Sequence, residues 1–218
     1  MALAIFDLDN TLIAGDSDHL WGEFLVARGL VDGADYARAN DRFYAQYRAG
    51  TLDIDAFLRF ALSPLREHPR DLLEELREHF VAQVIAPLML PAARDLIAAH
   101  RGAGDTLLII TATNTFIGTP IAARFGIPHL IATEPELRDG RYTGEVAGIP
   151  AFREGKVRRL DAWLTGRGET LAGSCFYSDS HNDLPLLGRV DRPVAVDPDP
   201  QLREVARARG WPILSLRG

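Results

Sequence analysis

Short apolar runs alternate with amphipathic stretches along most of the chain. The first run, residues 1–9, is apolar until it ends in acids, which is typical of a strand buried in a parallel sheet. Further strands are predicted at residues 106–111, 129–132, 173–178, 192–196 and 212–214. Helices are predicted at residues 92–100, 114–125, 153–164 and 201–209. Strands that alternate with helices indicate an α/β fold built on a doubly wound parallel sheet.

Residues 14–86 interrupt this alternation. Their apolar positions repeat with helical spacing, as between Ile54 and Leu62, and the block is too long for a crossover connection. We therefore predict a helical cap at residues 14–86, inserted into an α/β core formed by residues 1–13 and 87–218. A β-hairpin is predicted at residues 136–146, and the aromatic residues of the cap are interpreted as core packing.

Composition and charge narrow the class of protein. The 218 residues are 47% apolar and 25% charged, as in ordinary globular proteins, and the net charge of −6 argues against a nucleic-acid or membrane-surface partner. No apolar run approaches the ~18 residues of a membrane span, and no signal-like segment begins the sequence. The single cysteine, Cys175, excludes an internal disulfide. We expect a cytoplasmic protein, with the oligomeric state open.

Acidic side chains follow two of the predicted strands, at the edge where such sheets bind ligands. Asp7 and Asp9 end the first strand, and Asp179 and Asp183 follow the strand at 173–178. Converging carboxylates without a His/Cys cluster suit a hard cation such as Mg²⁺, and a carboxylate can also act as a nucleophile. Thr111 ends another strand, and Lys156 is the only lysine of the chain. Together these residues predict a phosphoryl-transfer site.

Four segments in this order resemble the motifs of the haloacid dehalogenase-like hydrolases, and more narrowly those of the phosphoserine-phosphatase-like branch, which carries a helical cap between its first two motifs. The segments are Asp7-Leu-Asp9-Asn-Thr11-Leu12, Thr111, Gly155-Lys156 and Ser178-Asp179-Ser180-His181-Asn182-Asp183. The resemblance covers nearly the whole chain. Ser178 and Ser180 depart from it, because the family often has glycines there, which puts the backbone of this loop in doubt.

The resemblance implies a role for each matching residue. Asp7 would be the nucleophile that forms an aspartyl phosphate, and Asp9 would protonate the leaving group and later activate water. Phosphate binding falls to Thr111, Ala112 and Lys156. The Mg²⁺ ligands would be Asp7, Asp9 through its carbonyl, Asp179 and Asp183, the last either binding the ion or orienting its water. His181 is interpreted as lying beside this site or in solvent.

The cap bears on the substrate. Asp16 matches an acid that holds the substrate amine in phosphoserine phosphatases, although it could instead cap a helix beginning near Ser17. The arginine that those enzymes use for the substrate carboxylate falls on Ala61 here, with Arg59 and Arg66 as nearby substitutes. We therefore expect a small phosphomonoester with a cation and no carboxylate, and histidinol phosphate fits. Asp18 and Glu23 are further candidate contacts, as is His19.

Three alternatives stay open at this point. The chain could be a phosphoserine phosphatase. It could be a receiver-type module, which is also phosphorylated on an aspartate at a strand end, although the cap and Asp9 argue against this. It could also be an inactive relative that only binds a phosphorylated ligand.

Overall fold

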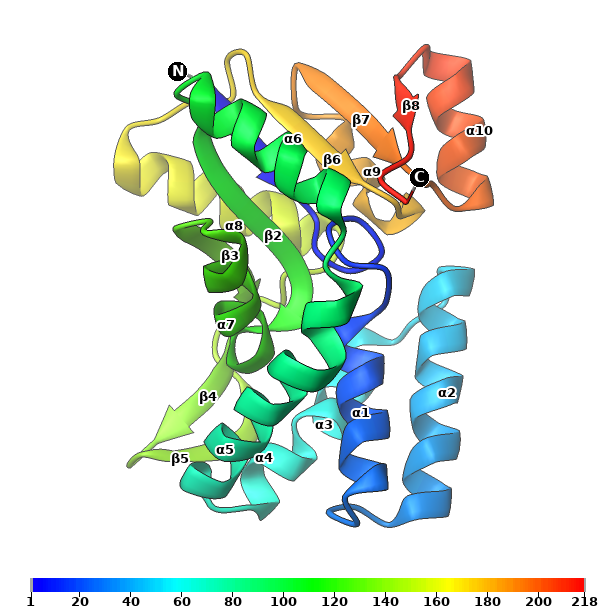
Figure 1. The fold of residues 1–218 in the computed structure, drawn as a ribbon, viewed down its shortest axis with the longest axis vertical. Coiled ribbons are helices and arrows are strands. Elements are labelled where there is room, and N and C mark those ends of the chain that lie inside the picture. Colours follow the sequence, from blue (N-terminus) through cyan, green and yellow to red (C-terminus); the bar gives the residue numbers. More distant parts are fainter. Residues whose placement is uncertain (1, 218) are drawn as a thin grey trace.

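A computed structural model describes residues 2–217, and its centre is a six-stranded parallel sheet (Figure 1). The strand order is β3-β2-β1-β6-β7-β8, with β1 in the middle. The strands are β1 (Leu3–Phe6), β2 (Thr106–Asn114), β3 (His129–Thr133), β6 (Cys175–Ser178), β7 (Arg192–Val196) and β8 (Ile213–Leu214). Because β1 pairs with both β2 and β6, the ends of these three strands meet at one edge of the sheet. The predicted α/β fold with a doubly wound sheet is confirmed.

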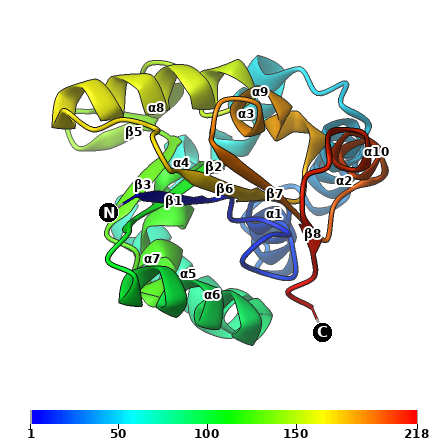
Figure 2. The same ribbon diagram turned by 90° about the horizontal axis from the view of Figure 1, so that it is seen from above.

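Helices cover both faces of the sheet, as Figure 2 shows from above. Helices α6 (Pro91–Gly102) and α7 (Thr115–Phe125) lie on one face, and α8 (Glu154–Arg167) and α9 (Leu184–Leu187) on the other. Helix α10 (Pro200–Arg209) packs with the α8 side. The two faces of β1 accordingly bury different side chains, Phe6 toward α6 and α7 and Ile5 toward α8. The near-continuous apolar run at the start of the chain follows from this double burial.

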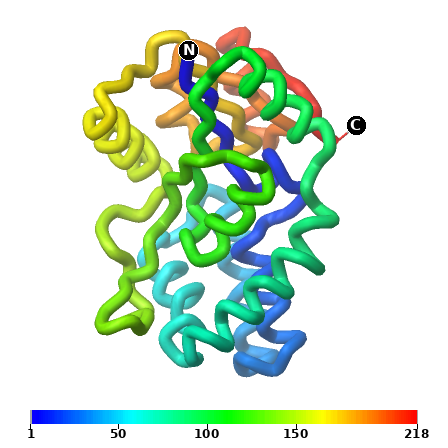
Figure 3. The backbone as a smooth tube through the Cα atoms, turned by 60° about the vertical axis from the view of Figure 1, so that its left-hand side comes forward, coloured from blue at the N-terminus to red at the C-terminus, as the bar shows by residue number. Residues whose placement is uncertain are grey.

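A group of helices lies between β1 and β2 in the sequence and beyond the carboxyl ends of the strands in space (Figures 1 and 3). Its members are α1 (Ser17–Ala27), α2 (Gly33–Ala49), α3 (Ile54–Ala61), α4 (Ser63–Glu67) and α5 (Arg70–Phe80), followed by a π-helical turn, η1 (Val81–Ile85), and a 3₁₀ turn, η2 (Ala86–Leu88). Across residues 2–217, no helix is both long and apolar enough to cross a membrane. The division of the chain into a core and a cap at residues 14–86 remains our proposal.

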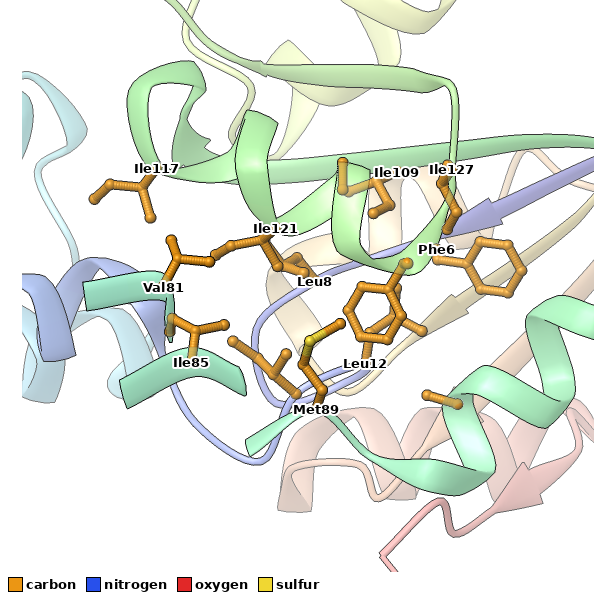
Figure 4. Packing of buried hydrophobic residues seen from close by; sticks show 14 of the residues in the cluster. Phe6, Leu8, Leu12, Val81, Ile85, Met89, Ile109, Ile117, Ile121 and Ile127 are labelled. Carbon is orange, nitrogen blue, oxygen red and sulfur yellow. The ribbon is translucent and has the colours of Figure 1, made fainter. Parts of the chain in front are cut away.

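One apolar cluster joins this group to the sheet (Figure 4). Val81 and Ile85 of η1 pack with Leu8 and Leu12, which follow β1, and with Ile121 of α7. All five side chains are almost completely buried. The apolar side chains of the loop after β1 therefore anchor this loop in the core, and its polar residues are left to face the other way.

The predicted hairpin is present as β4 (Pro135–Arg138) and β5 (Arg141–Val146), with Asp139 and Gly140 both at positive φ in the turn. Two strand ends differ from the prediction by three residues each. β1 ends at Phe6, so Asp7 and Asp9 follow the strand and do not belong to it. β2 does not end at Thr111 but continues to Asn114, which pairs with Thr133 of β3 after a register shift beyond Ile110. A search for apolar runs does not find this extension, because most of its side chains are polar.

Candidate active site

Asp7 directly follows β1, where the residue is 3% exposed and its side chain pairs with the only lysine of the chain. Lys156 Nζ lies 2.8 Å from Asp7 Oδ1 and 2.7 Å from Asp183 Oδ1, and it is itself buried. Ser178 Oγ donates to Asp183 Oδ2 at 2.7 Å. Residues from β1, α8 and the end of β6 thus converge, as the motifs predict.

Burial controls the charges in this group. Burial raises the pKa of Asp7 to about 7, although Lys156 opposes the rise. Burial alone would lower the pKa of Lys156, but Asp183 and Asp7 together raise it above its usual range. The lysine is therefore held as a cation between two carboxylates, and Asp7 is a carboxylate whose charge depends on a nearby cation.

Thr11 connects Asp7 to a second acid. Its hydroxyl lies 3.2 Å from Asp179 Oδ1 and 3.5 Å from Asp7 Oδ2, and it accepts the backbone N–H of Asp179 at 3.1 Å. Burial, followed by repulsion from Asp7, raises the pKa of Asp179 well above its usual range. Two carboxylates that are far apart in the sequence therefore face the same small space.

Asp9 is held on the other side of this space by hydrogen bonds to both of its oxygens. The backbone N–H of Ser17 donates to Oδ1 at 2.6 Å, and Thr113 Oγ1 donates to Oδ2 at 2.6 Å. Burial, followed by repulsion from Asp16, raises the pKa of Asp9 to about 6. A carboxyl group with such a pKa can both give and take a proton near neutral pH.

Thr111 and Ala112 line the pocket above these acids, within the extended end of β2. Thr111 Oγ1 accepts the N–H of Thr113 at 3.2 Å and lies 3.4 Å from Asp9 Oδ2. The helix predicted at residues 114–125 is present as α7, which starts at Thr115, and Asn114 caps it by accepting the backbone N–H of Ile117. The backbone at Thr111 and Ala112 is therefore an irregular strand end and not a free helix terminus.

The pocket continues from Asp7 and Asp9 toward the group of helices α1 to α5 that lies between β1 and β2 in the sequence, which we call the insert. Asp16, Asp18 and His19 line one side, and Phe43, Tyr44, Tyr47 and Phe57 supply an aromatic wall. Among the lining residues, all within the described part of the chain, there is no arginine or lysine. The aromatic residues of the insert were interpreted as core, and the structure divides them: Trp21 and Phe24 are core residues, whereas Tyr44 and Tyr47 face the pocket.

Asp16 and Asp18 reach the pocket, but Glu23 does not. Asp16 also caps α1 by accepting from His19 N at 2.9 Å, so the capping interpretation is confirmed, while contact with the substrate stays a prediction. Glu23 lies one turn beyond His19, is not among the residues that line the pocket, and has a side chain that is 57% exposed. We therefore correct the prediction that Glu23 contacts the substrate.

Neither arginine that could replace a carboxylate-binding residue is in the pocket. Arg59 lies in a groove beside Gly144 and Glu145 of the hairpin, and Arg66 pairs with Glu67 on the surface. The pocket therefore combines negative charge with aromatic rings.

Several residues that organise the site were not predicted from the sequence. Thr113 orients Asp9, Ser178 orients Asp183, and Asn114 Nδ2 donates to Asp18 Oδ1 at 3.0 Å. The available signal for Thr113 was the alternation of Thr111 and Thr113 at the end of β2. The doubt about the loop 178–180 is also resolved, because neither Ser178 nor Ser180 is among the residues with positive φ and Ser180 is extended.

The donor set is compatible with Mg²⁺. Asp7 and Asp179 offer two repelling carboxylates around one hydroxyl, and oxygen ligands are those that Mg²⁺ prefers. Within residues 2–217 no three His, Cys, Asp or Glu side chains form a ready metal cluster. Both carboxylate oxygens of Asp183 instead contact Lys156, and one of them also accepts the hydroxyl of Ser178. An ion here would complete its shell with carbonyl, water or phosphate oxygens.

Gly155 is required by the close approach of two backbone segments before Lys156. A Cβ atom at Gly155 would lie 2.0 Å from Pro150 O, so we expect Gly155→Ala to lower the free energy of unfolding by at least about 1–3 kcal/mol. Gly166, in the same helix, has open space around it, and Gly166→Ala should be neutral or stabilising by up to about 1 kcal/mol. Urea unfolding of both variants checks this. Equal stabilities would contradict it.

Comparison with known proteins agrees with this geometry. Residues 4–188 match the family model described as haloacid dehalogenase-like hydrolase. The chain is 50% identical to a histidinol-phosphatase of Neisseria meningitidis serogroup C over 99% of both chains. It is 33% identical to phosphoserine phosphatase SerB1 of Mycobacterium tuberculosis, over 99% of this chain and 71% of that protein.

Solved structures show the same fold. A crystal structure of a protein of unknown function from Bordetella pertussis Tohama I has a TM-score of 0.93 at 47% identity, covering 99% of this chain and 98% of that one. A phospho-aspartyl intermediate analogue of phosphoserine phosphatase has a TM-score of 0.72 at 19% identity, covering 99% and 93%. The fold, the four motifs and these relatives confirm the prediction of a phosphatase, and the chain belongs to the haloacid dehalogenase-like hydrolases.

Proposed function

We propose that the protein is a Mg²⁺-dependent phosphomonoesterase for small phosphorylated amines, with histidinol phosphate as its substrate. One observation carries the choice of substrate: the pocket beside Asp7 has acids, aromatic rings and His19, but no arginine or lysine among its lining residues. The 50% identity to a histidinol-phosphatase supports the same choice. A cytoplasmic location, suggested by the single cysteine, belongs to this proposal.

The chemistry uses Asp7 and Asp9 in turn. An Asp7 carboxylate oxygen attacks phosphorus, and the bond between phosphorus and the ester oxygen breaks while Asp9 gives that oxygen its proton. Asp9 then takes a proton from water, whose oxygen attacks the phosphoaspartate and releases phosphate. The pKa of Asp9, raised by burial to about 6, suits this double role.

Other side chains position and neutralise the phosphoryl group. Lys156 holds Asp7 and supplies positive charge, and Thr111 with the backbone at Ala112 borders the place where the phosphoryl oxygens would lie. Asp7, the carbonyl of Asp9 and Asp179 would hold Mg²⁺, with Asp183 acting through Lys156. When bound, the ion supplies charge neutralisation for the transferring phosphoryl group.

The substrate cation would lie between Asp16 and Asp18. Burial, together with repulsion from neighbouring acids, raises the pKa of Asp16 to about 6 and that of Asp18 well above its usual range, and no arginine or lysine lines the pocket beside them. An ammonium or imidazolium group would supply the missing positive charge. The wall formed by Phe43, Tyr47 and Phe57 offers apolar and π contacts to a flat ring.

A panel of phosphomonoesters tests this function. With Mg²⁺ we expect kcat/KM for histidinol phosphate to exceed that for phosphoserine by at least about tenfold, since one unpaired charge is worth about 1.4 kcal/mol or more. EDTA should abolish phosphate release. Faster turnover of phosphoserine would favour the phosphoserine phosphatase alternative, and no turnover of any ester would favour a binding or receiver-type module.

A variant at Asp18 can test recognition of the substrate cation separately from the chemical step. Asp18→Asn keeps an oxygen for Asn114 but removes a negative charge, so we expect kcat/KM for histidinol phosphate to fall about 10- to 100-fold. Hydrolysis of p-nitrophenyl phosphate, which carries no cation, should change little. Glu23→Gln is the matched control on the same helix and should behave like the unchanged protein. Equal losses on both esters would contradict a role in cation recognition.

A further inference from the structure

Two side chains of the sheet domain bind the carbonyl groups at the end of helix α2. Asn182 Nδ2 donates to Tyr47 O at 3.1 Å, and Arg153 Nη2 donates to Gly50 O at 2.6 Å. Arg153 Nε also donates to Asn182 Oδ1 at 3.0 Å, so the two side chains act as one unit. Carbonyl groups at a helix C-terminus carry partial negative charge, which a guanidinium group complements. The contact joins segments that are about a hundred residues apart in the sequence.

The backbone at Arg153 is strained. Its φ of 50° and ψ of −121° form a conformation that glycine adopts easily and that costs other residues about 1–3 kcal/mol. An arginine at such a position needs a compensating contact. Its guanidinium group lies 4.9 Å from the centre of the Phe152 ring and binds Gly50 and Asn182, and these contacts hold it in place.

The same two residues adjoin the catalytic cation. Arg153 O accepts the N–H of Lys156 at 3.0 Å, in the first turn of α8, and Asn182 directly precedes Asp183, which binds Lys156 Nζ. On the side of the insert, the carbonyl of Tyr47 belongs to a residue whose side chain lines the pocket. The approach is close, because a Cβ atom at Gly50 would lie 2.6 Å from His181 Nε2.

We propose that Arg153 is a positioning residue, which with Asn182 holds the end of α2 over the active site and so fixes the pocket wall relative to Lys156. This inference rests on the proposed phosphatase function. Arg153 does not touch the reacting atoms; it fixes how the wall that contacts the organic part of the substrate meets the phosphate-binding end of the site. Its loss should therefore affect substrates that span both parts.

The variant Arg153→Gly distinguishes positioning from a structural role. Glycine removes the strain together with the side chain, so we expect an unfolding midpoint equal to or above that of the unchanged protein. We also expect kcat/KM for histidinol phosphate to fall about 10- to 100-fold, since a charged hydrogen bond is lost. Arg153→Lys, which can still donate to Gly50 O, should restore part of the loss. Arg167→Ala, which removes an arginine stacked on Trp163 at the far end of α8, is the matched control.

Hydrogen exchange of the backbone amides of residues 45–52 provides a readout that needs no turnover. Exchange should be faster in Arg153→Gly and unchanged in Arg167→Ala. Unchanged exchange in Arg153→Gly, or unchanged kcat and KM, would overturn the proposal. If the unchanged protein hydrolyses no phosphomonoester, the proposed function has failed, and the exchange measurement still decides whether Arg153 holds α2.

Discussion

Asp7→Asn is expected to leave the protein folded and to reduce phosphate release by a factor on the order of 10⁴ or more, as removal of a nucleophile does in other enzymes. The amide has nearly the shape of the carboxylate. Its oxygen can face Lys156 and its NH₂ group can face Thr11 Oγ1, so no buried polar atom loses its partner. What disappears is the charged oxygen that attacks phosphorus.

Two measurements check this expectation. Phosphate release gives the loss of rate, and labelled substrate followed by denaturation shows whether phosphate is attached to the chain through a hydroxylamine-sensitive bond. The unchanged protein should carry the label and Asp7→Asn should not. Thermal unfolding controls for the fold. Comparable hydrolysis by Asp7→Asn would refute the assignment of the nucleophile.

Lys156→Met should lose both activity and stability. Lys156 is 2% exposed and pairs with Asp7 and Asp183, and breaking a buried ion pair by removing one partner costs about 3–5 kcal/mol. Without the cation, which normally lowers the pKa of Asp7, that pKa should rise above 7. A protonated Asp7 would be a poor nucleophile. The expected result is a large loss of turnover together with a lower free energy of unfolding.

Urea unfolding in EDTA measures the stability change without interference from metal. The double variant Lys156→Met/Asp183→Asn removes one of the carboxylates that lost its partner, so we expect it to recover part of the lost stability but none of the activity. A single variant as stable as the unchanged protein would contradict the view that Lys156 neutralises buried carboxylates.

Much of the fold could be predicted, because burial on both faces leaves a direct trace in the sequence. The strands around Ile5, Ile109 and Phe176 are continuous apolar runs, and Asp139-Gly140 marks the hairpin turn. The end of β2 could not be predicted, since its pairing with Thr133 depends on a bulge and its side chains are polar.

The contents of the pocket were predicted less well than the catalytic acids. Asp16 and Glu23 are seven residues apart and lie on one helix face, yet only Asp16 lines the pocket, because Glu23 lies about two turns farther along the helix, where its side chain is 57% exposed. Tyr47 and Trp21 are both aromatic residues of the insert, but one lines the site and the other is core. Sequence spacing gives the face of a helix, not what packs against each turn.

The sequence by itself determined the class of fold, the acids at the strand ends and the presence of a single lysine, because the alternation of strands with helices and the chemistry of each residue are local properties of the chain. Only the tertiary structure decided that Thr113 orients Asp9, that Asp183 binds Lys156, and that Arg153 reaches the end of α2. These contacts join segments brought together by folding, and nothing in the spacing of their residues encodes the distances between them.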